Sequence, residues 1–96
     1  MAFQIILTYT KEDPLVDWYV LPQSVRDLVE EYKADGRIIE WIEEEIDALT
    51  LQYRVTWDHQ PRSLEFDNES TNQACQAEKN SYNTANNITY AKTYGQ

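Results

Sequence analysis

Residues 37–47, with the sequence RIIEWIEEEID, decide the fold of this chain. Read as a helix, the stretch gathers its isoleucines and Trp41 into one stripe, and its three consecutive glutamates favour that conformation. Read as a strand, it places Ile39 and Trp41 on one face and the other three isoleucines on the opposite face. Gly36 is suited to ending a preceding helix, which leaves a new helix at this point without an N-cap. A strand can also form a hairpin with the next segment through a turn near 47–48, so we expect a strand, with a glutamate-rich helix as the alternative.

Three further segments show the alternation of apolar and polar residues that is typical of strands. Phe3–Thr10 places Phe3, Ile5, Leu7 and Tyr9 on one face. Residues 49–57 alternate in the same way from Leu49 to Trp57, and 88–94 form a weaker last strand. The sequence therefore predicts four strands in all.

Two helices are predicted between the strands. The first runs from Pro22 to Gly36, where Val25, Leu28, Val29 and Tyr32 recur at helical spacing. Ser24 and Asp27 have the spacing of a capping box at its start. Gly36 is expected to end it in the left-handed conformation.

The second helix is expected to begin at Ser70, where Ser70 and Gln73 also have capping-box spacing. Several asparagines weaken it, and Asn86-Asn87 can supply a left-handed cap at its end. Before it, residues 63–66 are expected to form a helical turn that carries Leu64 and Phe66 into the core. The stripe expected to be buried consists of Ala74, Ala77 or Glu78, Ser81, Tyr82 and Ala85.

The order strand, helix, strand, strand, helix, strand matches a ferredoxin-like βαββαβ arrangement, an α+β fold with an antiparallel sheet and two helices on one face. With 96 residues the chain predicts a single domain spanning 1–96. A core of this size is modest, so burial of the free sheet face in a homodimer is an expected gain. The segment 15–21 is rich in bulky apolar residues and is expected to cover an edge of the core.

Charge and composition exclude several classes of protein. The net charge is −9, and residues 11–47 carry twelve acidic and four basic residues. That balance argues against direct binding of nucleic acid, which requires clustered lysine and arginine. The longest apolar run is too short to span a membrane, and the N-terminus lacks the features of a signal peptide, so we expect a cytoplasmic protein.

Several short stretches of the chain resemble known proteins. The predicted fold is similar to the dimeric α+β barrel group, which includes the antibiotic-biosynthesis-monooxygenase-like proteins. This resemblance implies a dimer in which the sheet face away from the helices packs against a second subunit. Individual stretches also resemble uncharacterised small proteins of cyanobacterial phages, which implies a phage-encoded protein in a host cytoplasm. These stretches are 7–13 followed by Trp18-Tyr19, 35–38, 49–51 leading to Thr56-Trp57, and 82–89.

No catalytic set can be assembled from the sequence. His59 is the only histidine and Cys75 the only cysteine, so neither has the partners that a metal site requires. His59 is expected to be a solvated loop residue, with a general-base role as the alternative. Cys75 is expected to be a small packing residue. We predict no catalytic, cofactor-binding or metal-binding residues and no cofactor, and an enzyme is not favoured.

Two groups of residues are candidates for binding. The acidic residues of 40–47 could attract a basic partner, although charge on an edge strand also discourages aggregation. Aromatic side chains could line a pocket, and Tyr9, Trp57 and Tyr82 are the residues expected there. The acidic group consists of Glu40, Glu43, Glu44, Glu45 and Asp47.

Three functions remain open. The first is a non-enzymatic dimeric module that binds a host or phage protein. The second, implied by the resemblance and the aromatic residues, is a cofactor-independent monooxygenase or a small-ligand-binding protein. The third is an acidic mimic of nucleic acid that binds a basic protein.

Overall fold

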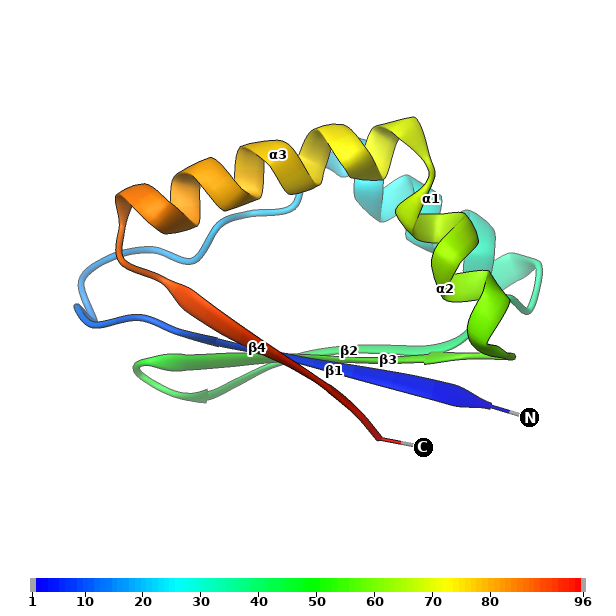
Figure 1. The fold of residues 1–96 in the computed structure, drawn as a ribbon, viewed down its shortest axis with the longest axis horizontal. Helices are drawn as coiled ribbons and strands as arrows, with labels where there is room; N and C mark the ends of the chain where they lie inside the picture. Colours follow the sequence, from blue (N-terminus) through cyan, green and yellow to red (C-terminus); the bar gives the residue numbers. More distant parts are fainter. Residues whose placement is uncertain (1, 96) are drawn as a thin grey trace.

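The computed structural model describes residues 2–95 and shows an α+β fold in which one four-stranded sheet is covered by three helices on one face (Figure 1). The opposite face of the sheet carries no helix. The elements, in chain order, are β1 (Phe3–Thr10), α1 (Gln23–Ala34), β2 (Ile38–Asp47), β3 (Thr50–Trp57), α2 (Gln60–Asp67), α3 (Ser70–Ala85) and β4 (Thr89–Tyr94).

The strand predicted over 37–47 is confirmed as β2, and it lies at one edge of the sheet. The sheet order is β2-β3-β1-β4, and each pair of neighbours is antiparallel. Gly36 ends the preceding helix with a φ of 78°, as expected for a left-handed C-terminal residue. The carboxylate of Asp47 accepts a hydrogen bond from the backbone N–H of Leu49 at 2.9 Å, which supports the tight turn between β2 and β3.

Alternation along β1 and β3 sets which side chains reach the core. Ile5 pairs with Val55 across the two strands, and both side chains are buried under the helices. The core is completed by Tyr32 of α1, which is fully buried, and by Phe66 of α2, with ring centroids 5.2 Å apart at 87°. The core therefore lies between the sheet and the helices, and it extends from Tyr32 and Trp57 at one end to Tyr9 and Ile88 at the other.

The structure has three helices where the sequence predicted two. The turn expected at 63–66 is part of a separate helix, α2, with a proline in its first turn. Phe66 is buried as expected, but Leu64 is 56% exposed, because on a helix two residues so close in sequence point in different directions. A short helix without an apolar stripe gives little periodic signal in the sequence.

Both predicted capping boxes are wrong. Pro22 is the N-cap of α1 and Glu69 is the N-cap of α3, and neither cap makes a side-chain hydrogen bond. Ser24 and Ser70 lie inside their helices instead. The predicted left-handed cap after α3 is present at Asn87, which has a φ of 57°.

The connection between β1 and α1 packs against the core only in part. Trp18 and Tyr19 contact the core, whereas Leu15 and Val20 are exposed. Lys11 is buried at its start, where its ammonium donates to the carbonyl of Val16 and lies 4.5 Å from the centre of the Trp18 ring. Among residues 2–95, no helix combines the length and apolar character that crossing a membrane requires.

Candidate functional site

The buried face of α3 is polar, contrary to the stripe of small residues predicted for it. Asn72, Cys75, Lys79 and Asn83 face inward, at the spacing of one helix face. The predicted residues Ala74, Ala77, Ser81 and Ala85 are exposed, and Tyr82 is half-buried. The prediction failed because it assumed that the less polar face of a weakly apolar helix must be the buried one.

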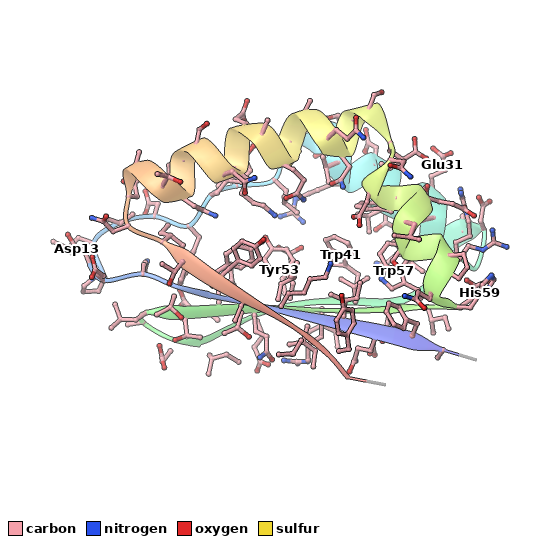
Figure 2. The ribbon with its side chains drawn as sticks, in the orientation of Figure 1. Asp13, Glu31, Trp41, Tyr53, Trp57 and His59 are labelled. Atoms are coloured by element: carbon pink, nitrogen blue, oxygen red, sulfur yellow. The ribbon has the colours of Figure 1, made fainter. Side chains whose placement is uncertain are left out.

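A cavity of about 70 Å³ lies between this polar helix face and the sheet. The sheet contributes aromatic and aliphatic side chains, and Figure 2 shows Trp41, Tyr53 and Trp57 on its helix-facing side. From the helix side, Asn72, Gln76 and Lys79 line the same space, and Asp67 at the end of α2 completes it. The cavity thus combines apolar walls with a few polar groups, and at about 70 Å³ it has room for a molecule of only a few non-hydrogen atoms.

One buried hydrogen-bond donor at this cavity has no partner within residues 2–95. The indole Nε1 of Trp57 is buried and makes no hydrogen bond. Buried polar groups are normally paired in native proteins, so this donor requires an explanation. Lys79 is only 7% exposed as a residue, and its ammonium lies over the face of Tyr9, 5.2 Å from the ring centre. Tyr9 and Trp57 stand at opposite ends of the β1–β3 pair, so the Lys79 ammonium does not lie beside the Trp57 indole.

Two titratable side chains at the cavity have altered proton affinity. Burial, reinforced by the charge of Glu43, holds the pKa of Tyr53 well above its usual range, so its phenol stays neutral. Burial also raises the pKa of the Asp67 carboxyl, although the charge of Lys92 opposes that shift. Asp67 is nevertheless an exposed residue, and it therefore stands at the rim of the cavity.

The three aromatic residues expected to line one pocket lie at three different places in the structure. Trp57 lines the cavity directly. Tyr9 does not line the cavity, but its ring faces the ammonium of Lys79, a residue that does. Tyr9 also packs edge-to-face on Tyr53 with ring centroids 5.8 Å apart. Tyr82 lies on the outer part of α3, where it packs against Tyr19 and donates a hydrogen bond to the Asp17 carbonyl at 2.6 Å.

The five acidic residues of β2 do not form one uniform surface. Glu43 accepts two hydrogen bonds from Arg26 and one from the Trp41 indole. Burial alone would raise the pKa of Glu43, but these hydrogen bonds outweigh it and hold the pKa below its usual range. On the bare face of the sheet, Glu44 pairs with Arg54 at 2.9 Å. Glu45 accepts a hydrogen bond from Trp18, Asp47 caps the turn, and Glu40 is exposed opposite Thr56. Much of this charge is therefore engaged within the chain.

A wider, open groove of about 430 Å³ runs between α1 and β2. Its lining includes Leu21, Val29 and Trp41, together with the Arg26–Glu43 ion pair. The charged groups that line it are already paired with each other, as are Lys33 and Glu30 at 3.4 Å. The charged groups that line the groove therefore compensate one another.

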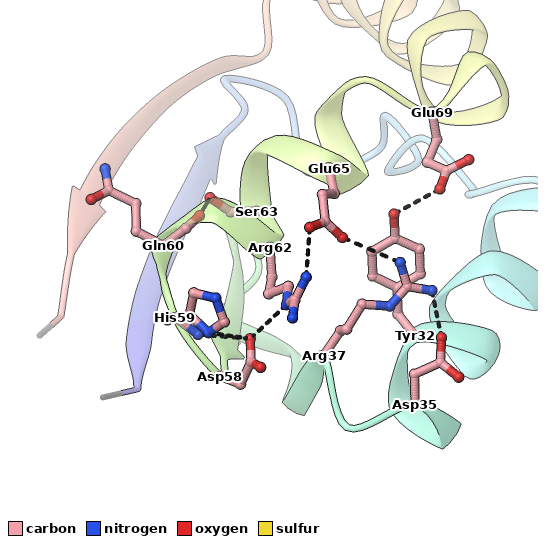
Figure 3. Close-up of polar contacts among 10 residues, drawn as sticks. All are labelled: Tyr32, Asp35, Arg37, Asp58, His59, Gln60, Arg62, Ser63, Glu65 and Glu69. Atoms are coloured by element: carbon pink, nitrogen blue, oxygen red, sulfur yellow. Dashed lines mark hydrogen bonds and ion pairs between the residues drawn. The ribbon is translucent and has the colours of Figure 1, made fainter.

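His59 belongs to a network of ion pairs at the opposite end of α2 (Figure 3). Its Nδ1 lies 3.1 Å from the Asp58 carboxylate, and Arg62 lies 3.4 Å from that same carboxylate. The nearby Ser63 hydroxyl donates to the Gln60 carbonyl, which is a helix contact and not a nucleophile–base pair. Within residues 2–95 no three His, Cys, Asp or Glu side chains are grouped so as to hold a metal ion.

Lys79 and Asn72 were missed as site residues by reasoning from the sequence. Their signal was present: a sixteen-residue helix without a convincing apolar stripe must bury some of its polar residues if it packs on a sheet. Only the position of β3 relative to α3, which the sequence does not reveal, brings Lys79 to the same cavity as Trp57.

Comparison with known proteins supports the fold. No protein-family model matches the chain, and no curated protein matches it in sequence. A crystal structure of a protein of unknown function from Nitrosomonas europaea is similar, with a TM-score of 0.50, 12% identity, and coverage of 98% of this chain and 89% of that chain. A second, from Bacteroides thetaiotaomicron, has a TM-score of 0.47, 7% identity and coverage of 97% and 96%, and is described as a conserved protein of unknown function and possible oxidoreductase. Nothing in these comparisons supports a relationship to phage proteins, and the likeness to the Nitrosomonas europaea protein, at 12% identity, shows an α+β fold alone.

Proposed function

We propose that this chain is a small-ligand-binding protein whose ligand occupies the cavity between α3 and the sheet. The observation that carries the proposal is a cavity between α3 and the sheet whose lining includes a buried donor without a partner, Trp57 Nε1. Burial of a polar group without a hydrogen bond costs free energy, on the order of 1–3 kcal/mol for a neutral group. A small domain with a modest core retains such groups at a net cost unless a bound molecule completes their hydrogen bonds.

The arrangement of the elements is consistent with this site. The strand order β2-β3-β1-β4, with all helices on one face, supports the ferredoxin-like arrangement proposed for the fold. The cavity lies between the helix layer and the sheet, where α3 approaches with a polar face. Catalysis of the monooxygenase type would use the same cavity, but the residues that line the cavity support ligand binding, which is the function we propose.

The proposed function can be tested with the indole signal of Trp57. In a nitrogen–proton correlation spectrum the three tryptophan indoles give separate signals, and Trp57→Phe identifies the one of interest. We expect that compounds of only a few non-hydrogen atoms, which match the volume of about 70 Å³, will shift this signal in the unaltered chain. Gln76→Phe, which adds a ring on the side of α3 that lines the cavity, should abolish the shift.

Ala77→Phe is the matched control, because Ala77 is the next residue on α3 and is exposed. It adds the same ring outside the cavity and should leave binding intact. If no compound at millimolar concentration shifts the Trp57 signal, or if Gln76→Phe leaves binding unchanged, the proposal is wrong.

A second proposal concerns the bare face of the sheet, which we propose to be the contact surface of a homodimer. On this face the residues of β1 and β4 are uncharged, although the whole chain carries a net charge of −9. Ile6 lies between Thr93 and Arg54 across the strands, and hydroxyl and amide side chains surround it. An uncharged surface on an acidic chain is where two copies can meet without mutual repulsion. The residues concerned are Gln4, Ile6, Thr8, Thr10, Thr89, Ala91 and Thr93.

Light scattering coupled to size-exclusion chromatography tests the dimer. We expect a dimer at micromolar concentration, and Thr8→Arg should convert it to a monomer by placing two positive charges face to face. Ala77→Arg, on the exposed side of α3, is the control and should remain dimeric. A monomeric unaltered chain would exclude the homodimer and leave this face to a different protein partner.

A further inference from the structure

Independently of the ligand cavity, we propose that the free edge of β2, together with the groove between β2 and α1, binds a basic peptide segment in an extended conformation. The segment would add to the sheet as a further strand beside β2. Three features of the structure carry this inference: an open strand edge, a groove with apolar residues beside it, and an excess of negative charge along the strand.

β2 has a partner strand on one side only. It lies at the end of the sheet, next to β3. From Glu40 to Glu45 it pairs with β3 without interruption, and the register shifts only beyond this stretch, at Ile39 and Ile46. Along the regular stretch, alternate residues direct their backbone N–H and C=O groups away from β3. An extended peptide can pair with these groups, because strand addition depends on main-chain hydrogen bonds.

The groove beside this edge can receive side chains of such a peptide. Leu21, Val29 and Trp41 are the apolar residues of its lining, and its volume is about 430 Å³. Trp41 lies on the helix-facing side of the sheet (Figure 2). A peptide residue paired opposite Trp41 would point to the same side, because side chains at paired positions of neighbouring strands share a face. An apolar side chain is therefore favoured at that position.

The charge of β2 defines the partner further. The strand contains five carboxylates and no basic residue. Two of the five are paired with arginines at 2.9 Å. Within residues 2–95 the other three have no basic nitrogen within 4.0 Å. A segment that carries lysine or arginine would be attracted to this edge, whereas the same acidic strand of a second copy would be repelled. The three unpaired carboxylates are those of Glu40, Glu45 and Asp47.

The alternation of the strand sets the expected sequence pattern of the peptide. Because Trp41 faces the helices, Glu40, Ile42 and Glu44 face the bare side of the sheet. Basic residues at every second position of the peptide would lie beside Glu40 and Glu44. The residues between them would lie on the side of the groove, where apolar side chains fit.

The test uses the synthetic peptide Lys-Val-Lys-Leu-Lys-Val-Lys, blocked at both ends, and two matched peptides. In the first, glutamate replaces every lysine. In the second, proline replaces the central leucine, which retains the charge but disrupts strand pairing. Dissociation constants are measured by isothermal titration calorimetry at physiological ionic strength. We expect the lysine peptide to bind about tenfold more tightly than either matched peptide.

Two variants of the chain locate the bound peptide. Glu40→Lys reverses a charge on the open edge and should weaken binding about tenfold. Glu31→Lys is the matched control, because it makes the same change at an exposed residue of α1 that does not line the groove. It should change the dissociation constant by less than about twofold. Should Glu40→Lys fail to fold, as judged by circular dichroism, Glu40→Gln replaces it and should also weaken binding.

Three results would overturn the proposal. If the lysine peptide does not bind at millimolar concentration, the charges of β2 serve only to keep strand edges of different copies apart. If the proline peptide binds as tightly as the lysine peptide, the attraction is one of charge alone and no strand is added. If Glu31→Lys weakens binding as much as Glu40→Lys, the peptide responds to the net charge of the chain and not to this edge.

Discussion

The guanidinium of Arg37 lies 3.6 Å above the centre of the Tyr32 ring, at the junction where α1 ends and β2 begins. Arg37 also pairs with Asp35 at 2.6 Å and with Glu65 of α2 at 3.3 Å (Figure 3). The phenol of Tyr32 in turn donates to Glu69, the N-cap of α3, at 2.7 Å. These two side chains therefore connect all three helices to the start of β2.

We predict that Arg37→Lys destabilises the fold by about 1–2 kcal/mol, because lysine retains the charge but loses the flat stacking and the forked hydrogen bonds. The measurement is the free energy of unfolding in urea. Arg54→Lys is the matched control, since Arg54 pairs with Glu44 on the bare sheet face, and it should cost less than about 0.5 kcal/mol. Equal losses in the two variants would contradict the role given to the Tyr32 stack.

The chain should lose stability as the pH rises above about 10, because three tyrosines are held neutral in the fold. Burial, together with the hydrogen bond to Glu69, raises the pKa of Tyr32 to about 12. Burial also raises the pKa of Tyr19 and Tyr53, with Glu78 and Glu43 adding to the effect. A folded pKa above the unfolded value gives stability that is complete below about pH 10 and is lost as the pH approaches the folded value.

Ultraviolet titration of tyrosinate checks this prediction. We expect Tyr19, Tyr32 and Tyr53 to ionise only above about pH 10 or on unfolding, as followed by circular dichroism. Tyr32→Phe should reduce the alkaline loss of stability and cost about 1 kcal/mol near neutral pH, where its hydrogen bond is lost. A single ionisation step for all seven tyrosines in a folded chain would contradict the prediction.

Gly36 should be replaceable by asparagine but not by alanine. Its φ of 78° lies in the left-handed region, and a Cβ atom there would meet nothing within 4 Å, so the cost of a side chain is that of the backbone conformation alone. We predict that Gly36→Ala destabilises the fold by about 1 kcal/mol and that Gly36→Asn costs less. Thermal unfolding of the two variants measures the difference, and an equal effect would show that the backbone conformation is not the cause.

The strands of the sheet were predictable because a strand with one buried face shows alternating apolar and polar residues. Phe3–Thr10 and Thr50–Trp57 were recognised in this way. The ambiguous stretch that became β2 was assigned from its context, since Gly36 ends a helix and the following turn favours a hairpin. Ile38 and Trp41 then pair opposite Trp57 and Val55 of β3.

The candidate site was only partly predictable, for a physical reason. Aromatic residues mark a pocket because they are large and amphipathic, and Trp57 was recognised on that basis. Lys79 and Asn72 were missed because pattern rules equate burial with apolar character, whereas the buried face of α3 is mostly polar. The short helix α2 was missed for the opposite reason, since eight residues carry too little periodic signal.

Asp67 and Glu69 lie two residues apart but should respond oppositely to loss of their charge. Asp67 is the last residue of α2, where a negative charge opposes the helix dipole, and burial raises the pKa of its carboxyl. Glu69 is the N-cap of α3, where a negative charge is favourable, and it accepts the Tyr32 hydrogen bond.

We predict that Asp67→Asn stabilises the fold near pH 7 by about 0.3–1 kcal/mol, whereas Glu69→Gln destabilises it. Because the folded pKa of Asp67 is raised, the destabilisation grows as the pH rises from the unfolded pKa to the folded pKa and is complete above the folded value. It is absent once the carboxyl is protonated in both states. The gain from Asp67→Asn should therefore vanish near pH 3. Urea unfolding at the two pH values measures both effects. A loss of stability in Asp67→Asn near pH 7 would mean that its carboxylate has a favourable partner at the cavity rim.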